Sequence, residues 1–402
     1  MNSYLNVVKY LSVSVVQLLI GFASIPIVTN LMSPEELGRF GVFMSATALL
    51  VPLLTLCSDS YFPVVKVTLS KSDFAIVKRS TYQYSALFTF IVTIILGLYC
   101  YLTSSDWTYL VLCIPIFVFI RGLRLSGQTE LVIDERITLF GVSNILISLV
   151  SLFLTVLFLL YVSDNALSRV CALLVAELAV LIGLLKYITP ISNVSFSLDE
   201  LKKSIYYSLP LLMSLAPAWV VNEYGRIFVS QHAGLEQTGI FTVALQISAF
   251  QLQLNSALSN AFIKNIYSDI RNAFSFSRVF SFLCFLLFMS VSGGLFVYYL
   301  APYVVSSSYA GFVNISLIAF VGVFFQSLAI LPSLYANYTK KTTWRFRALF
   351  ISAISFLVLL YGAVDSQNIL RDVVTYYSIA MFIYFIVISY FAWSYYVKSY
   401  FA

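Results

Sequence analysis

The chain has 402 residues, of which 60% are hydrophobic and 10% are charged. A soluble protein carries about 25% charged residues, so this composition excludes a soluble globular fold and indicates a polytopic membrane protein. The net charge of +6 calls for no nucleic-acid partner, because the basic residues gather in the loops on one side of the predicted membrane spans.

Twelve stretches of the chain are apolar over the roughly 20 residues that a membrane-spanning helix requires. In chain order they are residues 9–32, 40–63, 81–102, 108–132, 137–161, 166–188, 205–230, 239–262, 278–301, 309–335, 346–364 and 373–396. The sequence therefore predicts an all-α integral membrane protein with twelve transmembrane helices.

The lysines and arginines between these spans are distributed asymmetrically. Seventeen lie in alternate connections or just outside the first and last spans, whereas the opposite connections hold only Arg39, Arg169 and Arg371. Positively charged loops stay in the cytoplasm, so we expect both termini there. The N-terminus shows no strongly basic region and no small-residue cleavage site, which predicts that the first span is an uncleaved start-transfer helix.

Two short passages, residues 33–42 and 234–243, resemble each other at an offset of 201 residues. At this offset, 6 of the 22 positions from Gly38 to Asp59 are identical. Each passage follows one apolar span and opens the next, which indicates a doubled membrane domain of the kind that transporters use. We expect an N-terminal lobe, a cytoplasmic linker and a C-terminal lobe, at residues 1–190, 191–204 and 205–402. The alternative is two loops that use glycine independently as punctuation.

The connections between spans are short. The longest, residues 64–80 and 189–204, have about 16 residues each, too few for an extramembrane domain.

The chain has no glycine-rich phosphate loop, so we do not expect it to hydrolyse ATP itself. Its single histidine and five cysteines, all five within predicted spans, favour packing roles over a metal site or disulfides. We expect no catalytic residue, no metal and no cofactor.

Ionisable residues at membrane depth are energetically expensive and usually mark function or pairing. Arg121 and Arg124 share one face of the fourth span, where they form either an anion site or a pair that snorkels to the headgroups. Glu177, near the middle of the sixth span, is either a proton-titrating group or the partner of an arginine on another helix. Asp59, near the inner end of the second span, is an ion-coupling candidate or is solvated at headgroup level.

The seventh span carries a further pair, Glu223 and Arg226, three positions apart. The two side chains form a mutual ion pair, or Arg226 binds phosphates of the substrate while Glu223 orients it. Both residues are therefore site candidates, Arg226 for substrate and Glu223 for ion coupling.

The eighth span has a polar stripe in which Gln246, Gln253 and Asn260 recur every seven residues. They lie within an arc of about 40° and over a length of about 21 Å on an α-helix. Side-chain amides both donate and accept hydrogen bonds, which suits a hydroxyl-rich ligand; the alternative is bonding between helices. A second polar arc on the opposite face, formed by Ser248, Gln251, Asn255 and Ser259, is more typical of packing.

Residues 31–40, Leu-Met-Ser-Pro-Glu-Glu-Leu-Gly-Arg-Phe, together with Gly239-Ile240-Phe241, resemble the corresponding segments of the O-antigen repeat-unit flippases of the Wzx type. These flippases belong to a wider superfamily that includes multidrug and polysaccharide exporters. The resemblance implies a MATE-like fold of two six-helix bundles around a cavity lined by spans 1, 2, 7 and 8. Arg226, Gln246, Gln253 and Asn260 would belong to that lining, whereas Arg121 and Arg124 would lie outside it.

The resemblance also implies a function. Such a protein carries undecaprenyl-pyrophosphate-linked oligosaccharide across the bacterial inner membrane by alternating access, driven by a gradient of H⁺ or Na⁺. Its expected partners are that substrate, the membrane lipids and the polysaccharide polymerase machinery.

Two other functions compete with this expectation. A multidrug or cation antiporter of the same fold should favour buried acids, whereas the deep charges here are mixed, with Arg121, Arg124 and Arg226 beside Glu177 and Glu223. A membrane glycosyltransferase or polysaccharide polymerase would need a larger outer loop than this chain offers.

Overall fold

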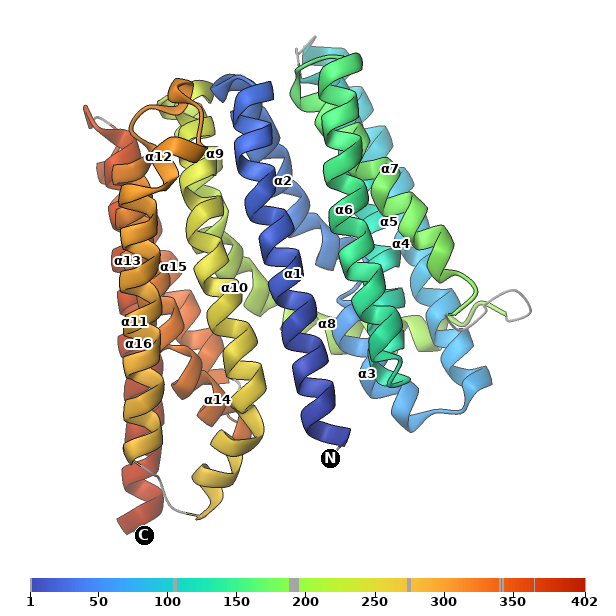
Figure 1. Cartoon of the computed structure of the whole chain (residues 1–402). Coiled ribbons are helices and arrows are strands. Elements are labelled where there is room, and N and C mark those ends of the chain that lie inside the picture. The colour runs from blue at the N-terminus through green and yellow to red at the C-terminus, as the bar shows by residue number, and fades with distance from the viewer. Residues whose placement is uncertain are drawn as a thin grey trace. The chain divides into compact units, whose positions relative to one another are not determined.

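The computed structural model describes residues 2–103, 107–187, 195–272, 276–339, 341, 343–364 and 366–401, with the side chains of residues 2–11, 14, 137, 256–282, 337–338 and 396–401 outside the description. Every regular element in these ranges is helical (Figure 1). The first half contains α1 (Asn2–Leu31), α2 (Pro34–Leu54), α3 (Ser58–Thr68), α4 (Lys71–Thr103), α5 (Thr108–Ile133), α6 (Ile137–Tyr161) and α7 (Ala166–Leu184). The second half contains α8 (Leu198–Asn222), α9 (Tyr224–His232), α10 (Leu235–Asn272), α11 (Phe276–Tyr299), α12 (Ala301–Val304), the 3₁₀ turn η1 (Ser307–Tyr309), α13 (Phe312–Leu328), α14 (Ile330–Tyr338), α15 (Thr343–Gly362) and α16 (Ile369–Phe401).

The helices coincide with the predicted membrane spans. Each span falls on one helix or on two consecutive ones, as α2 and α3 do for the second span. Within the described residues, nine helical segments are long and apolar enough to cross a membrane, and Val15–Leu31 and Leu283–Tyr299 are shorter apolar helices. The prediction of an all-α membrane fold is therefore confirmed.

The helix boundaries repeat at the offset seen in the sequence. α1 ends at Leu31 and α9 at His232, 201 residues later. α2 begins at Pro34 and α10 at Leu235, again 201 residues apart. The later helices drift slightly from this offset, since α5 and α13 begin 204 residues apart, at positions 108 and 312. The doubled architecture predicted from the two glycine motifs is thus present in the helices themselves.

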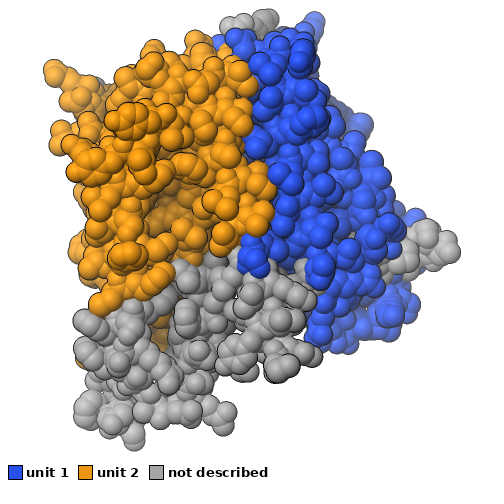
Figure 2. Space-filling view, in the orientation of Figure 1, with its two compact units in different colours: residues 1–13, 39–216 blue, residues 14–38, 217–402 orange. Residues whose placement is uncertain are grey.

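The described chain forms two compact units, shown in different colours in Figure 2. Unit 1 consists of residues 1–13 and 39–216, and unit 2 of residues 14–38 and 217–402. The lobe boundaries expected from the sequence, at residues 190 and 205, remain a prediction, and α8 already begins at Leu198 within the expected linker.

The connection predicted at residues 64–80 is helical over most of its length. α3 continues to Thr68 and α4 begins at Lys71, so only Leu69 and Ser70 separate the two helices. In the structure, Lys66 and Lys78 stay within the helices because carboxylates of Glu130 and Asp134 neutralise them.

The second span is interrupted where α2 passes into α3. Leu56 and Cys57 have positive φ angles of 50° and 47°, a conformation that costs roughly 1–2 kcal/mol for a residue with a Cβ atom. The amide of Cys57 donates to the carbonyl oxygen of Pro52 at 2.9 Å, and the hydroxyl of Ser208 donates to the carbonyl oxygen of Leu56. A Cβ atom at Gly122 of α5 would lie 2.2 Å from Cγ2 of Thr55, so glycine is needed where α5 passes this break.

Each unit has its own apolar core. In unit 2 a single large cluster joins α9, α10, α13, α15 and α16 and contains Phe228, Phe241, Phe356 and Tyr377. In unit 1 a smaller cluster around Phe62 and Phe74 joins α3 to α4, and another, formed by Leu131, Val180 and Leu184, joins α5 to α7. These cores fix the rotation of α9 and α10, which carry several of the predicted site residues.

Candidate functional site

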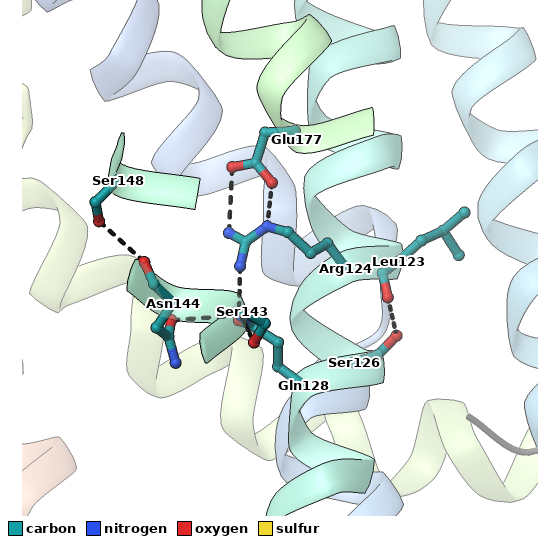
Figure 3. Close-up of polar contacts among 8 residues, drawn as sticks. All are labelled: Leu123, Arg124, Ser126, Gln128, Ser143, Asn144, Ser148 and Glu177. Carbon is teal, nitrogen blue, oxygen red and sulfur yellow. Dashed lines mark hydrogen bonds and ion pairs between the residues drawn. The ribbon is translucent and has the colours of Figure 1, made fainter. Parts of the chain in front are cut away.

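Arg124 and Glu177 form a buried ion pair between α5 and α7 of unit 1 (Figure 3). Nε of Arg124 donates to Oε2 of Glu177, and Nη2 donates to Oε1 at 3.1 Å. Both side chains are buried. The bidentate geometry matches the planar fork of a guanidinium to a carboxylate and is among the stronger polar contacts in proteins. The two charges neutralise each other inside the helical bundle.

A chain of amides and hydroxyls extends this pair to α6. Nη1 of Arg124 donates to Oε1 of Gln128 at 2.6 Å. Nε2 of Gln128 in turn donates to the hydroxyl of Ser143 at 2.9 Å and to Oδ1 of Asn144 at 3.3 Å. Figure 3 shows these side chains pointing toward one another from three helices. Buried polar groups are stable in an apolar bundle only when they are satisfied in this way.

In this network Arg124 and Glu177 are ion-pair partners. All three nitrogen positions of the Arg124 guanidinium donate to protein acceptors, and the side chain is too deeply buried to snorkel to headgroups. For Glu177 the geometry matches one of its two expected roles, partner of an arginine on another helix. The guanidinium of Arg121 lies over the ring of Phe117, 5.7 Å from the ring centroid.

A second buried charge cluster lies among α3, α4 and α5. Nζ of Lys78 lies 2.5 Å from Oε1 of Glu130, and the side chains are 1% and 0% exposed. Nζ of Lys66 lies 2.8 Å from Oδ1 of Asp134 and 3.6 Å from Oε2 of Glu130. Two lysines and two carboxylates thus form a neutral cluster that ties the ends of three helices together.

Sequence reasoning missed this cluster, because Lys66 and Lys78 were counted as cytoplasmic loop charges. One signal was available. Glu130 and Asp134 lie four positions apart, which places them on the same face of α5. Two acids on one face at a helix end, opposite a loop rich in lysine, favour pairing over separate solvation.

In unit 2, Glu223 and Arg226 pair at a break in the seventh span. α8 ends at Asn222 and α9 begins at Tyr224, which leaves Glu223 at the junction. Nη1 of Arg226 donates to Oε2 of Glu223, and both side chains are half-buried. The mutual ion pair is the simpler of the two arrangements expected from the sequence. It places a guanidinium next to an interrupted helix, where some backbone N–H and C=O groups have no hydrogen-bond partner within the helix.

The two polar arcs of α10 have different surroundings. On the packing face, Nε2 of Gln251 donates to the hydroxyl of Ser290 on α11, and Nδ2 of Asn255 donates to the hydroxyl of Ser327 on α13 at 2.7 Å. Ser248 belongs to the same buried face. This arc bonds helices to each other, as expected for packing.

The stripe on the other face of α10 is not used in this way. Gln246 is half-buried and Gln253 is exposed. Within the described part of the chain, neither side chain has a hydrogen-bond partner. Their amides are therefore available to a ligand. Asn260, the third member of the predicted stripe, has its side chain outside the described residues.

Asp59, the remaining candidate, lies in the first turn of α3 directly after the break, with its side chain exposed. A carboxylate in the first turn is favoured by the helix dipole. Among the residues that the structure describes, no group of three or more His, Cys, Asp or Glu side chains could hold a metal ion.

Comparison with known proteins gives a clear result only for the fold. No protein-family model and no curated protein matches the chain. Among solved structures, the lipid II flippase MurJ in an inward closed conformation is similar, with a TM-score of 0.76, 15% identity, and coverage of 96% of this chain and 87% of that chain.

Two structures of MATE-family multidrug resistance transporters of the MOP superfamily are also similar. The inward-facing conformation gives a TM-score of 0.74 at 14% identity over 96% of this chain and 97% of that chain. The outward-facing conformation gives 0.61 at 13% identity over 95% of both chains. The chain therefore has the helical fold that MATE transporters and the flippase MurJ share.

Proposed function

We propose that the protein is a flippase that moves undecaprenyl-pyrophosphate-linked oligosaccharide, such as an O-antigen repeat unit, from the inner to the outer leaflet of the bacterial cytoplasmic membrane. Transport would proceed by alternating access, with both termini in the cytoplasm. The assignment is to a transporter rather than an enzyme, and the polysaccharide polymerase machinery would act on the product.

The observation that carries this proposal is the division of the polar residues on α10. The amides of Gln251 and Asn255 bond to neighbouring helices, whereas those of Gln246 and Gln253 have no partner in the described part of the chain. Side-chain amides without hydrogen-bond partners are energetically unfavourable in a transmembrane helix. A hydroxyl-rich substrate would form hydrogen bonds with them. An oligosaccharide offers many hydroxyl groups to two amides spaced seven residues apart.

The fold supports the same assignment. MurJ, which is similar over most of this chain, is itself a lipid II flippase. Arg226 at the break between α8 and α9 is the proposed ligand of the substrate's pyrophosphate, because a guanidinium fork matches phosphate oxygens. Arg121 and Arg124 are weaker candidates for this role, since Arg124 is engaged by Glu177.

A multidrug antiporter of the same fold is the second candidate, favoured by the MATE structures among the similar proteins. Cationic drugs call for acidic side chains. In this structure the two deepest acidic candidates, Glu177 and Glu223, are each paired with an arginine. That pairing favours an anionic substrate. Coupling to H⁺ or Na⁺ is part of the proposal, with Asp59, Glu177 and Glu223 as the candidate groups.

A deletion strain tests the proposed function. We expect loss of surface glycan and accumulation of completed repeat units on the inner leaflet, with recovery when the wild-type gene is supplied. Normal surface glycan, combined with increased sensitivity to cationic drugs, would reject the flippase and support the antiporter.

The role of the amide stripe is tested in the same strain. A Gln246→Ala/Gln253→Ala variant should restore markedly less surface glycan than wild type while reaching the membrane in equal amounts. Gln83→Ala, which changes an exposed glutamine on α4, is the matched control and should restore it fully. Equal recovery with both variants would remove the stripe from the substrate site.

A further inference from the structure

A polar cavity lies in unit 2 where α10, α13 and α16 begin. It has a volume of about 560 Å³. Three polar side chains line it, Gln237 from α10, Asn314 from α13 and Arg371 from α16. All three are exposed, and within the described residues none has a hydrogen-bond or ion-pair partner. The remaining wall is apolar and includes Ile240 and Leu370.

A second cavity, of about 530 Å³, runs along the outside of α13 and α16. Its walls include Val321, Ile379 and Phe382, whose apolar side chains are exposed. The hydroxyls of Thr375 and Ser378 also border it, but each donates to a backbone carbonyl oxygen. The groove is therefore apolar along its length.

The two cavities adjoin each other, and together they are called the composite cavity. Leu317 and Ile318 line both of them. The far end of the groove is bounded by Phe325 and Phe382, whose ring centroids are 4.9 Å apart. From position 314 to position 325 of α13 the distance is about 16 Å at the rise of an α-helix, close to half of a hydrocarbon core of about 30 Å. A polar end and an apolar groove one leaflet deep match the shape of a lipid.

We propose that this composite cavity binds a phospholipid with an anionic phosphodiester headgroup. Arg371 pairs with the phosphate, Gln237 and Asn314 bond to headgroup or glycerol oxygens, and one acyl chain lies in the groove between α13 and α16. The proposed topology places the helix beginnings at the outer leaflet, so the ligand comes from that leaflet. The proposal does not depend on which substrate the protein transports.

The charge of the cavity selects this ligand over the lipid-linked substrate. Arg371 is the only cationic side chain among the described residues that line the cavity. One guanidinium complements the single negative charge of a phosphodiester. A pyrophosphate, which carries more charge, would be only partly neutralised.

The test uses the full chain in nanodiscs of phosphatidylglycerol and phosphatidylcholine, released for native mass spectrometry. Wild-type protein should retain phosphatidylglycerol in preference to phosphatidylcholine. Arg371→Gln should reduce that preference by about fivefold, the scale of one exposed ion pair. Arg347→Gln, which removes an exposed arginine from α15, is the control and should leave it unchanged.

A second variant distinguishes loss of lipid binding from misfolding of Arg371→Gln. Asn314→Asp adds a negative charge to the cavity, while an acid in the first turn of α13 favours that helix. We expect it to fold and to lose the preference for phosphatidylglycerol. A phosphatidylglycerol with a photoreactive acyl chain should cross-link wild type mainly within residues 314–325 and 371–382.

Three results would overturn the proposal. One is equal retention of the two lipids by wild type, and another is an equal loss of preference in Arg347→Gln and Arg371→Gln. The third is displacement of phosphatidylglycerol by undecaprenyl pyrophosphate at lower concentration, which would assign the cavity to the transport substrate.

Discussion

Gly38 and Gly239, which are 201 positions apart in the sequence, lie against each other where α2 and α10 begin. A Cβ atom on Gly38 would lie 3.1 Å from the amide nitrogen of Gly239 and 2.1 Å from the carbonyl oxygen of Leu235. A Cβ atom on Gly239 would lie 1.9 Å from the carbonyl oxygen of Pro34. Each glycine therefore faces the residue that begins the other helix, and the two copies of the repeated motif pack backbone against backbone.

This contact predicts that neither glycine can be replaced. In Gly38→Ala or Gly239→Ala the new methyl group would meet backbone atoms, which cannot move aside as a flexible side chain can. We expect a loss of stability of about 1–3 kcal/mol, the usual range for overpacking, measured as a lower unfolding midpoint in detergent. Gly183→Ala is the control, because nothing lies within 4 Å of that position and alanine favours a helix by about 0.5–1 kcal/mol. An unchanged midpoint for both motif variants would contradict the close contact.

The helices and their duplication could be predicted because both depend on local composition. Apolar runs of sufficient length specify membrane helices, and the offset of the glycine motifs recurs in the ends of α1 and α9. The contact between Gly38 and Gly239 could not be predicted, because glycine has no side chain whose size or polarity would indicate its neighbour in the fold. The break at Leu56 and Cys57 was also missed, because neither residue type favours a positive φ.

The cluster of Lys66, Lys78, Glu130 and Asp134 predicts unequal effects of removing its two acids. Glu130→Gln removes the carboxylate charge beside the fully buried Lys78 and should cost about 3–5 kcal/mol. Asp134 is 33% exposed, so Asp134→Asn should cost no more than about 1 kcal/mol. Unfolding midpoints of the two purified variants measure the difference. Equal midpoints would show that Glu130 is not the buried partner of Lys78.

The candidate site was predictable in its residues but not in its pairings. Sequence analysis singled out Arg124 and Glu177 because charges at membrane depth are rare. It left open what each would contact, since their pairing depends on how α5 and α7 rotate against each other. For Glu223 and Arg226 the pairing was one of the expected arrangements, because residues three apart on a helix are neighbours.

The Arg124–Glu177 pair predicts strong coupling between its two members. Glu177→Gln or Arg124→Met alone should destabilise the protein by about 3–5 kcal/mol, because one charge remains buried without its partner. The double variant Arg124→Met/Glu177→Leu removes both charges and should be less destabilised than the sum of the single changes. Glu236→Gln, an exposed acid on α10, should have little effect. Additive losses in the double variant would contradict a direct pair.

The same variants test Glu177 as a coupling group. If Glu177 exchanges the coupling proton, transport by any folded variant that lacks its carboxylate should no longer depend on the proton gradient. A normal dependence on the gradient in Glu177→Gln would leave the residue with its structural role alone. Asp59→Asn would then be the next variant to measure.

For Arg226, an ion pair with Glu223 and binding of the substrate predict different effects of mutation on export. If its guanidinium binds the pyrophosphate, Arg226→Ala should reduce export by about tenfold or more, the loss expected for one charged hydrogen bond, while the protein remains in the membrane. Arg226→Lys should recover only part of the activity, because an ammonium keeps the charge but lacks the fork. If Arg226 served only to neutralise Glu223, the double variant Glu223→Gln/Arg226→Gln would restore export. Normal surface polysaccharide in Arg226→Ala, or full recovery in the double variant, would show that Arg226 does not bind the substrate. The proposed substrate site would then consist of the amides of Gln246 and Gln253 on α10.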